Sequence, residues 1–257
     1  GWRGINHSYS LVNQWQIKEL KNKSNIFFND VPFISANWNI KKNDSGLDEE
    51  TKNLINNLNP PSAKQEIDIT YRISGPYNFD SNFNSSLLFI FGTCEQKFLD
   101  KGFYINGSPE ILSKEKKIFI HTPSNWSKEG FIKAGFNEEQ VIVIPHGVDT
   151  ETFNLLPEEE IKEIKKHYKL NDDDFVLCNI GAMTENKGVD FLIAAYGILK
   201  KKFKNLKLIL KDQSNLYGVK PNYIFNKLRE STLNKKYNII NSEMLNDIVI
   251  ISKNLNL

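Results

Sequence analysis

The chain has 257 residues, of which 40% are hydrophobic, a length and composition that suit one large or two ordinary α/β domains and exclude wholesale disorder. Its net charge is +2 at pH 7, so it lacks the basic excess of a nucleic-acid-binding protein, and we expect no nucleic-acid partner. No apolar run reaches membrane-spanning length and no signal-peptide pattern is present, so we expect a cytoplasmic protein; membrane association stays open without support from the sequence.

The first 150 residues alternate between helical and extended patterns, which is typical of an α/β domain. The later apolar runs of this segment are short and continuous, as expected for strands of a parallel sheet that is covered on both faces. Predicted helices cover residues 5–20, 47–58 and 124–134, and predicted strands cover residues 25–28, 67–73, 87–91, 118–120 and 141–144.

Residues 145–156 have no clear periodicity and end at Pro157, so we place a domain boundary at residue 150. This predicts two Rossmann-like domains, residues 1–150 and residues 151–257. In the second domain, predicted helices cover residues 158–169, 188–203 and 221–233, and predicted strands cover residues 175–180, 206–210 and 248–252. One face of the helix at residues 188–203 is expected to meet the sheet through Phe191, Leu192, Ala195, Ile198 and Leu199.

The most informative segment is residues 175–190, FVLCNIGAMTENKGVD. An apolar strand stops at Gly181, a polar loop follows, and Lys187-Gly188 opens a helix. In a strand–helix–strand unit the ligand crevice lies at the carboxyl ends of the strands, where a helix N-terminus offers free N–H groups and partial positive charge to anions. Because the helix dipole disfavours a lysine there, a phosphate-binding role explains Lys187 better than a solvated side chain does.

A second segment, residues 141–153, has the sequence VIVIPHGVDTETF. Together the two segments resemble glycosyltransferase family 4, a group of retaining glycosyltransferases with the GT-B fold. The first signature of that family is I-x-V-I-P-N-G-V-D-x-x-x-F, and His146 takes the place of its asparagine. The second is G-R-x-x-x-x-K-G; Gly181, Lys187 and Gly188 match it, and Ala182 takes the place of the arginine.

The resemblance implies a GT-B-like α/β fold with two parallel-sheet domains, an acceptor-side domain at residues 1–150 and the first half of a donor-binding domain at residues 151–257. The first strand of the family fold would be missing, as would the half of the donor domain that carries the family's E-x7-E motif. The implied activity is that of a hexosyltransferase-like enzyme, which moves a sugar from a nucleotide-diphosphate sugar to a hydroxyl of a glycan or other acceptor with retention. As a fragment, the chain is expected to be inactive by itself.

The resemblance also implies roles for individual residues. Lys187 would neutralise the donor diphosphate, and Gly181 and Gly188 would let the backbone approach it closely. Gly4 would present its backbone to the same phosphates from the other domain. At Ala182 the chain lacks a cation that the family places opposite the diphosphate, which would cost charge-assisted hydrogen bonds.

Two cationic residues, Arg3 and Lys211, are alternatives for the missing charge. The candidate catalytic residue is His121, which ends a predicted strand on the crevice side and could meet the acceptor or the donor sugar. For His146, in the loop between the domains, we favour a loop-structuring role over a chemical one.

GT-B enzymes generally stabilise the leaving diphosphate without a metal ion, and no residues here have metal-ligand spacing. We therefore expect no metal and no cofactor; the donor is the substrate, and the sequence does not identify its base. Two alternatives stay open: a non-catalytic nucleotide-sugar-binding or scaffold protein, which Ala182 favours, and a GT-B sugar-nucleotide epimerase. A hydride-transferring Rossmann enzyme is disfavoured because no G-x-G-x-x-G follows a strand.

Overall fold

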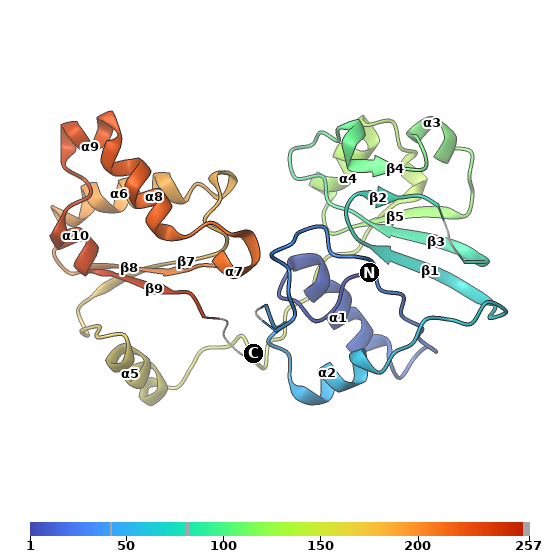
Figure 1. The fold of residues 1–257 in the computed structure, drawn as a ribbon, viewed down its shortest axis with the longest axis horizontal. Helices are drawn as coiled ribbons and strands as arrows, with labels where there is room; N and C mark the ends of the chain where they lie inside the picture. The colour runs from blue at the N-terminus through green and yellow to red at the C-terminus, as the bar shows by residue number, and fades with distance from the viewer. Residues whose placement is uncertain (42, 81–82, 254–257) are drawn as a thin grey trace. The chain divides into compact units, whose positions relative to one another are not determined.

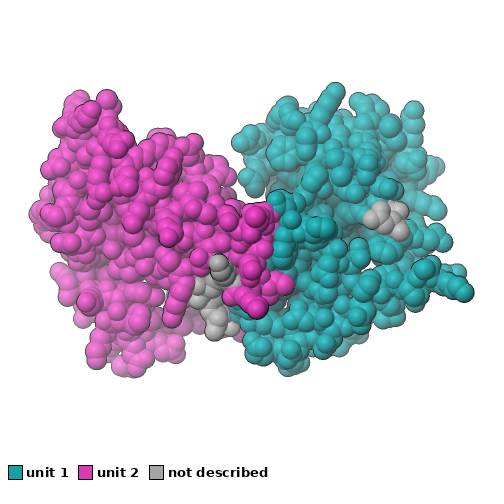
Figure 2. All heavy atoms as spheres, viewed as in Figure 1, with its two compact units in different colours: residues 1–34, 44–149, 256–257 teal, residues 35–43, 150–255 magenta. Residues whose placement is uncertain are grey.

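The computed structural model describes residues 1–41, 43–80 and 83–253. These residues form two compact units, which Figure 2 shows in different colours. Within the described chain, the first unit contains residues 1–34 and 44–149, and the second contains residues 35–43 and 150–253. The sequence gives no sign that residues 35–43 group with the second unit, because this grouping depends on contacts with residues far along the chain.

The first unit is built on a four-stranded parallel sheet with the order β1-β3-β5-β6 (Figure 1). Its strands are β1 (Ile67–Ile73), β3 (Ser85–Phe91), β5 (Ile118–Thr122) and β6 (Val141–Val143), and β2 (Tyr77–Asn78) pairs separately with β4 (Tyr104–Ile105). The helices are α1 (Ser8–Leu20), α2 (Glu49–Asn56), α3 (Pro109–Leu112) and α4 (Asn125–Lys133), with short 3-10 turns at Lys101–Phe103 and Glu138–Gln140.

Among the described residues, two apolar clusters help to hold the first unit together. Leu88, Ile90 and Ile120 of the sheet pack against Phe131 of α4, and this forms the larger core. The smaller cluster joins α1 to α2 and includes Phe28. The strand predicted at residues 25–28 is therefore wrong. Of this run only Phe28 is buried, because it fills the space between two helices, and its amide donates to the carbonyl of Asn59.

The second unit is built on a three-stranded parallel sheet with the order β7-β8-β9. The strands are β7 (Phe175–Ile180), β8 (Leu206–Lys211) and β9 (Ile248–Ile251). The helices are α5 (Glu158–His167), α6 (Val189–Lys200), α7 (Ser214–Tyr217), α8 (Pro221–Glu230), α9 (Thr232–Tyr237) and α10 (Ser242–Asn246), with a 3-10 turn at Glu185–Lys187. In Figure 1, α6 and α8 lie on one side of this sheet and α5 lies on the other. The parallel pairing in both units confirms the predicted α/β class.

The helix predicted at residues 221–233 is interrupted. Ser231 has extended dihedral angles, and its side chain accepts a hydrogen bond from the amide of Asn234 at 3.1 Å. Serine at this position caps the start of α9, so the segment forms α8 and α9 instead of one helix. No helix in the described ranges has the length and apolarity needed to cross a bilayer.

The buried face of α6 differs from the predicted one. Phe191 is 76% exposed, and Ala195, Ile198 and Leu199 are also exposed. The buried residues of α6 are instead Val189, Ile193, Ala194, Tyr196, Gly197 and Lys200. A Cβ at Gly197 would lie 2.2 Å from a side-chain carbon of Ile239, so the glycine lets the helix approach closely on this side.

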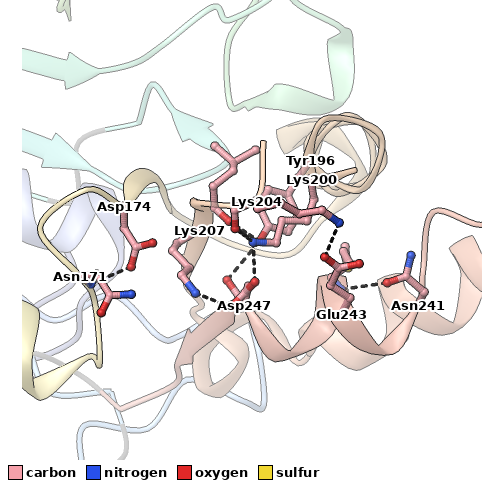
Figure 3. Close-up of polar contacts among 11 residues, drawn as sticks. Asn171, Asp174, Tyr196, Lys200, Lys204, Lys207, Asn241, Glu243 and Asp247 are labelled. Carbon is pink, nitrogen blue, oxygen red and sulfur yellow. Dashed lines mark hydrogen bonds and ion pairs between the residues drawn. The ribbon is translucent and has the colours of Figure 1, made fainter. Parts of the chain in front are cut away.

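Asp247 ties together the amino ends of β8 and β9 (Figure 3). Its carboxylate accepts from the buried Lys200 at 2.5 Å and also pairs with Lys207. Tyr196 donates its hydroxyl to the backbone carbonyls of Leu206 and Asp247, each at 3.2 Å. Because this cluster lies at the end of the sheet opposite the carboxyl edge, we assign it a structural role.

Candidate functional site

The loops that carry the two sequence motifs follow the carboxyl ends of parallel strands. Pro145–Asp149 comes after β6 in the first unit, and Gly181–Lys187 comes after β7 in the second unit. In open parallel sheets, ligands bind outside this edge, where strands stop and loops reach into solvent. Each unit therefore offers a candidate binding edge of its own.

The loop after β7 is held closely to the sheet at its start. The amide of Gly181 donates to the carbonyl of Lys211 at 3.0 Å, which continues the pairing of β7 with β8. Ala182 and Met183 then point into the core, with 4% and 2% of their surface exposed. The Ala182 side chain is thus directed away from solvent. At this point of the loop the chain therefore presents no cation in place of the arginine of the family signature.

Gly188 forms the junction between the loop and α6. Its φ of 62° lies in the left-handed region, which a glycine adopts without strain. Its amide donates to the carbonyl of Glu185 at 3.0 Å, and its carbonyl accepts from Leu192 at 3.1 Å. The amides of Gly181 and Gly188 are both used within the protein, so their contribution to a ligand site would be room for close approach.

Lys187 lies in the 3-10 turn immediately before α6, and its side chain is exposed. Within the described ranges its ammonium forms no ion pair or hydrogen bond. Its neighbour Glu185 pairs instead with Lys227 at 2.5 Å. Gly188, the N-cap of α6, makes no side-chain cap, and the Phe191 amide donates to the Asp190 carboxylate at 3.0 Å. Within the described chain, Lys187 and the amides of Val189 and Asp190 therefore remain available to an anion.

Arg3, one of the two alternatives for the missing cation, binds other residues of the first unit. Its guanidinium forms a bidentate pair with Asp30, with N–O distances of 3.0 and 2.7 Å. A third nitrogen donates to the carbonyls of Ile55 and Leu58 at the end of α2, and the guanidinium stacks over Phe28 at 4.7 Å. These contacts use most of the N–H donors of the side chain to fix α2, which favours a structural role for Arg3 over that of the missing cation.

Gly4 has a φ of 78°, and its amide donates to the side-chain carbonyl of Gln14 at 3.0 Å. The predicted role, in which Gly4 offers its backbone to the donor phosphates, would therefore need this bond to open. His7 is the N-cap of the neighbouring α1, and its Nδ1 accepts from the amide of Tyr9 at 3.2 Å. Burial lowers the pKa of His7 to about 4, so this cap is neutral at pH 7.

His121, the candidate catalytic residue, is buried, with 4% of its surface exposed. Its Nδ1 lies 2.7 Å from the hydroxyl of Tyr71, and its Nε2 lies 3.1 Å from the carbonyl oxygen of Ile144. Gln16 of α1 donates to the same hydroxyl at 3.1 Å. Both ring nitrogens are thus engaged within the first unit, which favours a role in positioning the loop after β6 over direct contact with a substrate.

His146 is exposed, and its ring packs against Phe91 with centroids 5.6 Å apart. The ring of His121 meets the same phenylalanine edge-on at 5.3 Å. Burial lowers the pKa values of both histidines. The contact with Phe91 agrees with the loop-structuring role that the sequence favours for His146.

Sequence reasoning missed three polar residues at these sheet edges. Asp212 follows β8 and is fully buried; its carboxylate accepts from the amide of Ser214 at 2.9 Å and from the hydroxyl of Ser252 at 2.6 Å. Burial, the largest single cause, raises the pKa of Asp212, but its hydrogen bonds with Ser252 and Ser214 and the nearby Lys211 charge together hold it below its usual value. Tyr71 was missed in β1. Asp212 lies two residues beyond a predicted strand and Ser252 is the last residue of another, so a polar residue at or just past the carboxyl end of a predicted strand was the available signal.

The described residues contain no group of three His, Cys, Asp or Glu side chains that could hold a metal ion. Two hollows, of about 300 Å³ beside α8 and β9 and about 780 Å³ beside α4 and β6, are lined by no residue of the two motif loops. The chemistry of the side chains on the motif loops, and not these two hollows, therefore identifies the candidate site.

No protein-family model matches the chain. A stretch of 65 residues is 32% identical to the alpha-galactosylglucosyldiacylglycerol synthase of Streptococcus pneumoniae strain ATCC BAA-255 / R6; it covers 25% of this chain and 17% of that protein. The chain is also similar to the solved structure of Anabaena Alr3699/HepE in complex with UDP-glucose, at 16% identity and a TM-score of 0.47; the match covers 66% of this chain and 43% of that one. A second similar structure is that of a glycosyltransferase from Rickettsia africae ESF-5, at 17% identity and a TM-score of 0.48, and the match covers 67% of this chain and 42% of that one.

The chain thus spans less than half of each of these proteins. At these TM-scores and identities, the likeness to the solved structures does not bear on the function of this chain. The sequence similarity to the synthase is local.

Proposed function

We propose that the chain is part of a retaining glycosyltransferase of family 4, with the GT-B fold, and that its second unit binds a nucleotide-diphosphate sugar. One observation carries the proposal: Lys187, an exposed lysine without a partner in the described ranges, directly precedes the uncapped start of α6 at the carboxyl edge of a parallel sheet. The local similarity to a synthase whose name denotes a glycosylated diacylglycerol supports sugar transfer. We propose residues 1–150 as the acceptor-side domain and residues 151–257 as donor-binding.

The proposed chemistry follows from the charge that develops during transfer. The bond between the anomeric carbon and the diphosphate breaks, and negative charge collects on the leaving diphosphate. The oxygen of the acceptor hydroxyl forms the new glycosidic bond on the same face, and its proton passes to an oxygen of the leaving diphosphate. The Lys187 ammonium and the N–H groups of α6 would stabilise that charge. No metal is needed in this scheme, because a cation and a helix start supply the positive potential.

In the first unit, we propose that His121 acts as a positioning residue. It holds the carbonyl of Ile144, the residue before the Pro145–Asp149 loop, while Phe91 supports the His146 ring in that loop. The loop would then present a fixed surface to a glycan or other hydroxyl acceptor. A cytoplasmic location, where nucleotide sugars are substrates, is part of the proposal.

A second candidate function is sugar-nucleotide binding without turnover. The observation that favours it is Ala182, whose buried methyl group gives the loop no cation at the place where the resemblance leads us to expect an arginine.

Binding and product formation test both candidates. Uridine, guanosine and adenosine diphosphates, and the corresponding sugar nucleotides, would be titrated calorimetrically against the chain and against the complete protein that contains it. Saturable binding of one diphosphate, together with release of that diphosphate and formation of a glycoside by the complete protein, is the expected result. Binding without any new glycoside would favour the binding protein, and no binding of any of the three would refute both functions.

A further inference from the structure

Lys211 lies next to the loop that carries Lys187. It is the last residue of β8 and is the register partner of Ile180, the last residue of β7. Its carbonyl accepts the amide of Gly181 at 3.0 Å. Alternation along β8 directs Leu206, Leu208 and Leu210 into the apolar core, so Lys211 belongs to the other face at the point where the strand ends.

Lys211 is buried, but its ammonium has few hydrogen-bond acceptors around it. The residue is 8% exposed, and its Nζ donates to the backbone carbonyl of Asp212 at 2.5 Å. Across the described ranges, no carboxylate pairs with it. The adjacent Asp212 carboxylate is already used by Ser214 and Ser252.

Lys200, the other deeply buried lysine of this unit, provides a direct comparison. Its ammonium meets the Asp247 carboxylate at 2.5 Å and the carbonyls of Lys204 and Leu206, which matches its three N–H donors. Lys211 has one such acceptor. A buried ammonium normally requires a counter-ion. The two N–H groups of Lys211 that have no acceptor in the described chain therefore indicate that an anion binds there. Burial lowers the pKa of Lys211, and the nearby Asp212 offsets this only in part.

We propose that Lys211 binds the diphosphate of the donor and supplies the cation that Ala182 does not. This inference depends on the proposed function. The oxygens of a diphosphate would accept the remaining N–H groups of Lys211, while Lys187 engages the same anion from the far end of the loop. The site would then hold two lysines, one buried and one exposed, in a chain whose loop has an alanine at position 182.

Inorganic pyrophosphate is the probe that tests Lys211 without reference to the base. Calorimetric titration would compare the wild-type chain with Lys211→Met, which removes the charge and keeps an apolar stem of similar length. Lys202→Met is the matched control, because Lys202 is exposed beyond the opposite end of α6 and is unpaired within the described chain. We expect Lys211→Met to weaken binding of pyrophosphate and of the preferred nucleoside diphosphate about tenfold or more, and the control to bind as wild type does.

The outcomes separate the two proposals. If the wild-type chain binds a nucleoside diphosphate and Lys211→Met binds it equally well, the inference about Lys211 is overturned and the proposed function stands. If the wild type binds none of the diphosphates, the proposed function fails. If Lys211→Met does not fold, Lys211→Gln replaces it; failure of both variants to fold would show that Lys211 is a structural residue and would overturn the inference.

Discussion

The hydroxyl of Tyr71 lies 2.7 Å from Nδ1 of His121. On the other side of the ring, Nε2 faces the carbonyl oxygen of Ile144, which can only accept a hydrogen bond. Nε2 therefore carries the proton of the neutral ring, and Nδ1 accepts from Tyr71. This order fixes the tautomer of His121 and connects α1, through Gln16, to the loop after β6.

We expect Tyr71→Phe to destabilise the first unit by about 1–2 kcal/mol, because it leaves a buried ring nitrogen without a donor. The measurement is the free energy of unfolding in urea. Tyr104→Phe is the control, since the Tyr104 hydroxyl forms no hydrogen bond within the described ranges. Equal stability of the two variants would show that the contact between Tyr71 and His121 contributes nothing.

The His7 cap predicts a pH dependence of stability. The pKa of His7 falls from 6.5 to about 4 on folding, so the unfolded chain takes up the proton first as the pH decreases. The neutral His7 ring therefore contributes its full stabilisation above pH 6.5, and this contribution is lost as the pH falls from 6.5 to about 4. His7→Asn keeps an acceptor at the cap and does not titrate.

The variant should therefore lose about 1 kcal/mol less stability than the wild type between pH 7 and pH 4.5, a figure reduced for the partial exposure of the ring. Fluorescence of Trp2, whose ring centroid lies 5.4 Å from that of His7, reports unfolding of this region. Parallel pH profiles for the two proteins would exclude His7 as the titrating group.

We expect Lys187→Ala in the complete enzyme to lower turnover by about 10²-fold or more, because the lost charge stabilises the leaving diphosphate. The melting temperature should change little, since the side chain is exposed and makes no ion pair in the described chain. Lys202→Ala is the control, because Lys202 is an exposed lysine beyond the opposite end of α6. An unchanged rate of glycoside formation would remove Lys187 from the mechanism.

The orientation of α6 predicts opposite effects for two neighbouring apolar residues. Ile193 is fully buried, so Ile193→Ala should cost about 2–5 kcal/mol of the free energy of unfolding. Phe191 is 76% exposed, so Phe191→Ala should change it by less than about 0.5 kcal/mol. Urea unfolding followed by circular dichroism gives both values. A larger loss of stability for Phe191→Ala than for Ile193→Ala would support the buried face that the sequence predicted.

Removing the charge of Asp247 should destabilise the second unit strongly. Asp247→Asn leaves the buried Lys200 without its carboxylate, and loss of one member of a buried pair costs about 3–5 kcal/mol. Glu243→Gln is the matched control, because its pair with Lys204 is exposed and worth about 0–1 kcal/mol. Thermal unfolding of both variants measures the difference, and similar melting temperatures would show that the Asp247 cluster does not stabilise the fold.

The sequence by itself determined the local features of this protein. Apolar runs, capping residues and prolines are local signals, so they placed most strands and put the two motif loops directly after β6 and β7. They also singled out Lys187, which lies exposed at the start of α6. Local signals were sufficient here because hydrogen bonding within a turn or a helix involves residues close in the chain.

Only the tertiary structure decided which candidate residues already bind other parts of the protein. Arg3 is fixed by Asp30 and the end of α2, His121 by Tyr71 and Ile144, and the buried face of α6 by the approach of Ile239 to Gly197. The sequence offered Lys211 only as one of two alternatives for the missing cation, and the structure shows that it is buried and that its ammonium has a single acceptor in the described chain. Burial and pairing of this kind arise between residues far apart in sequence, and no local pattern records them.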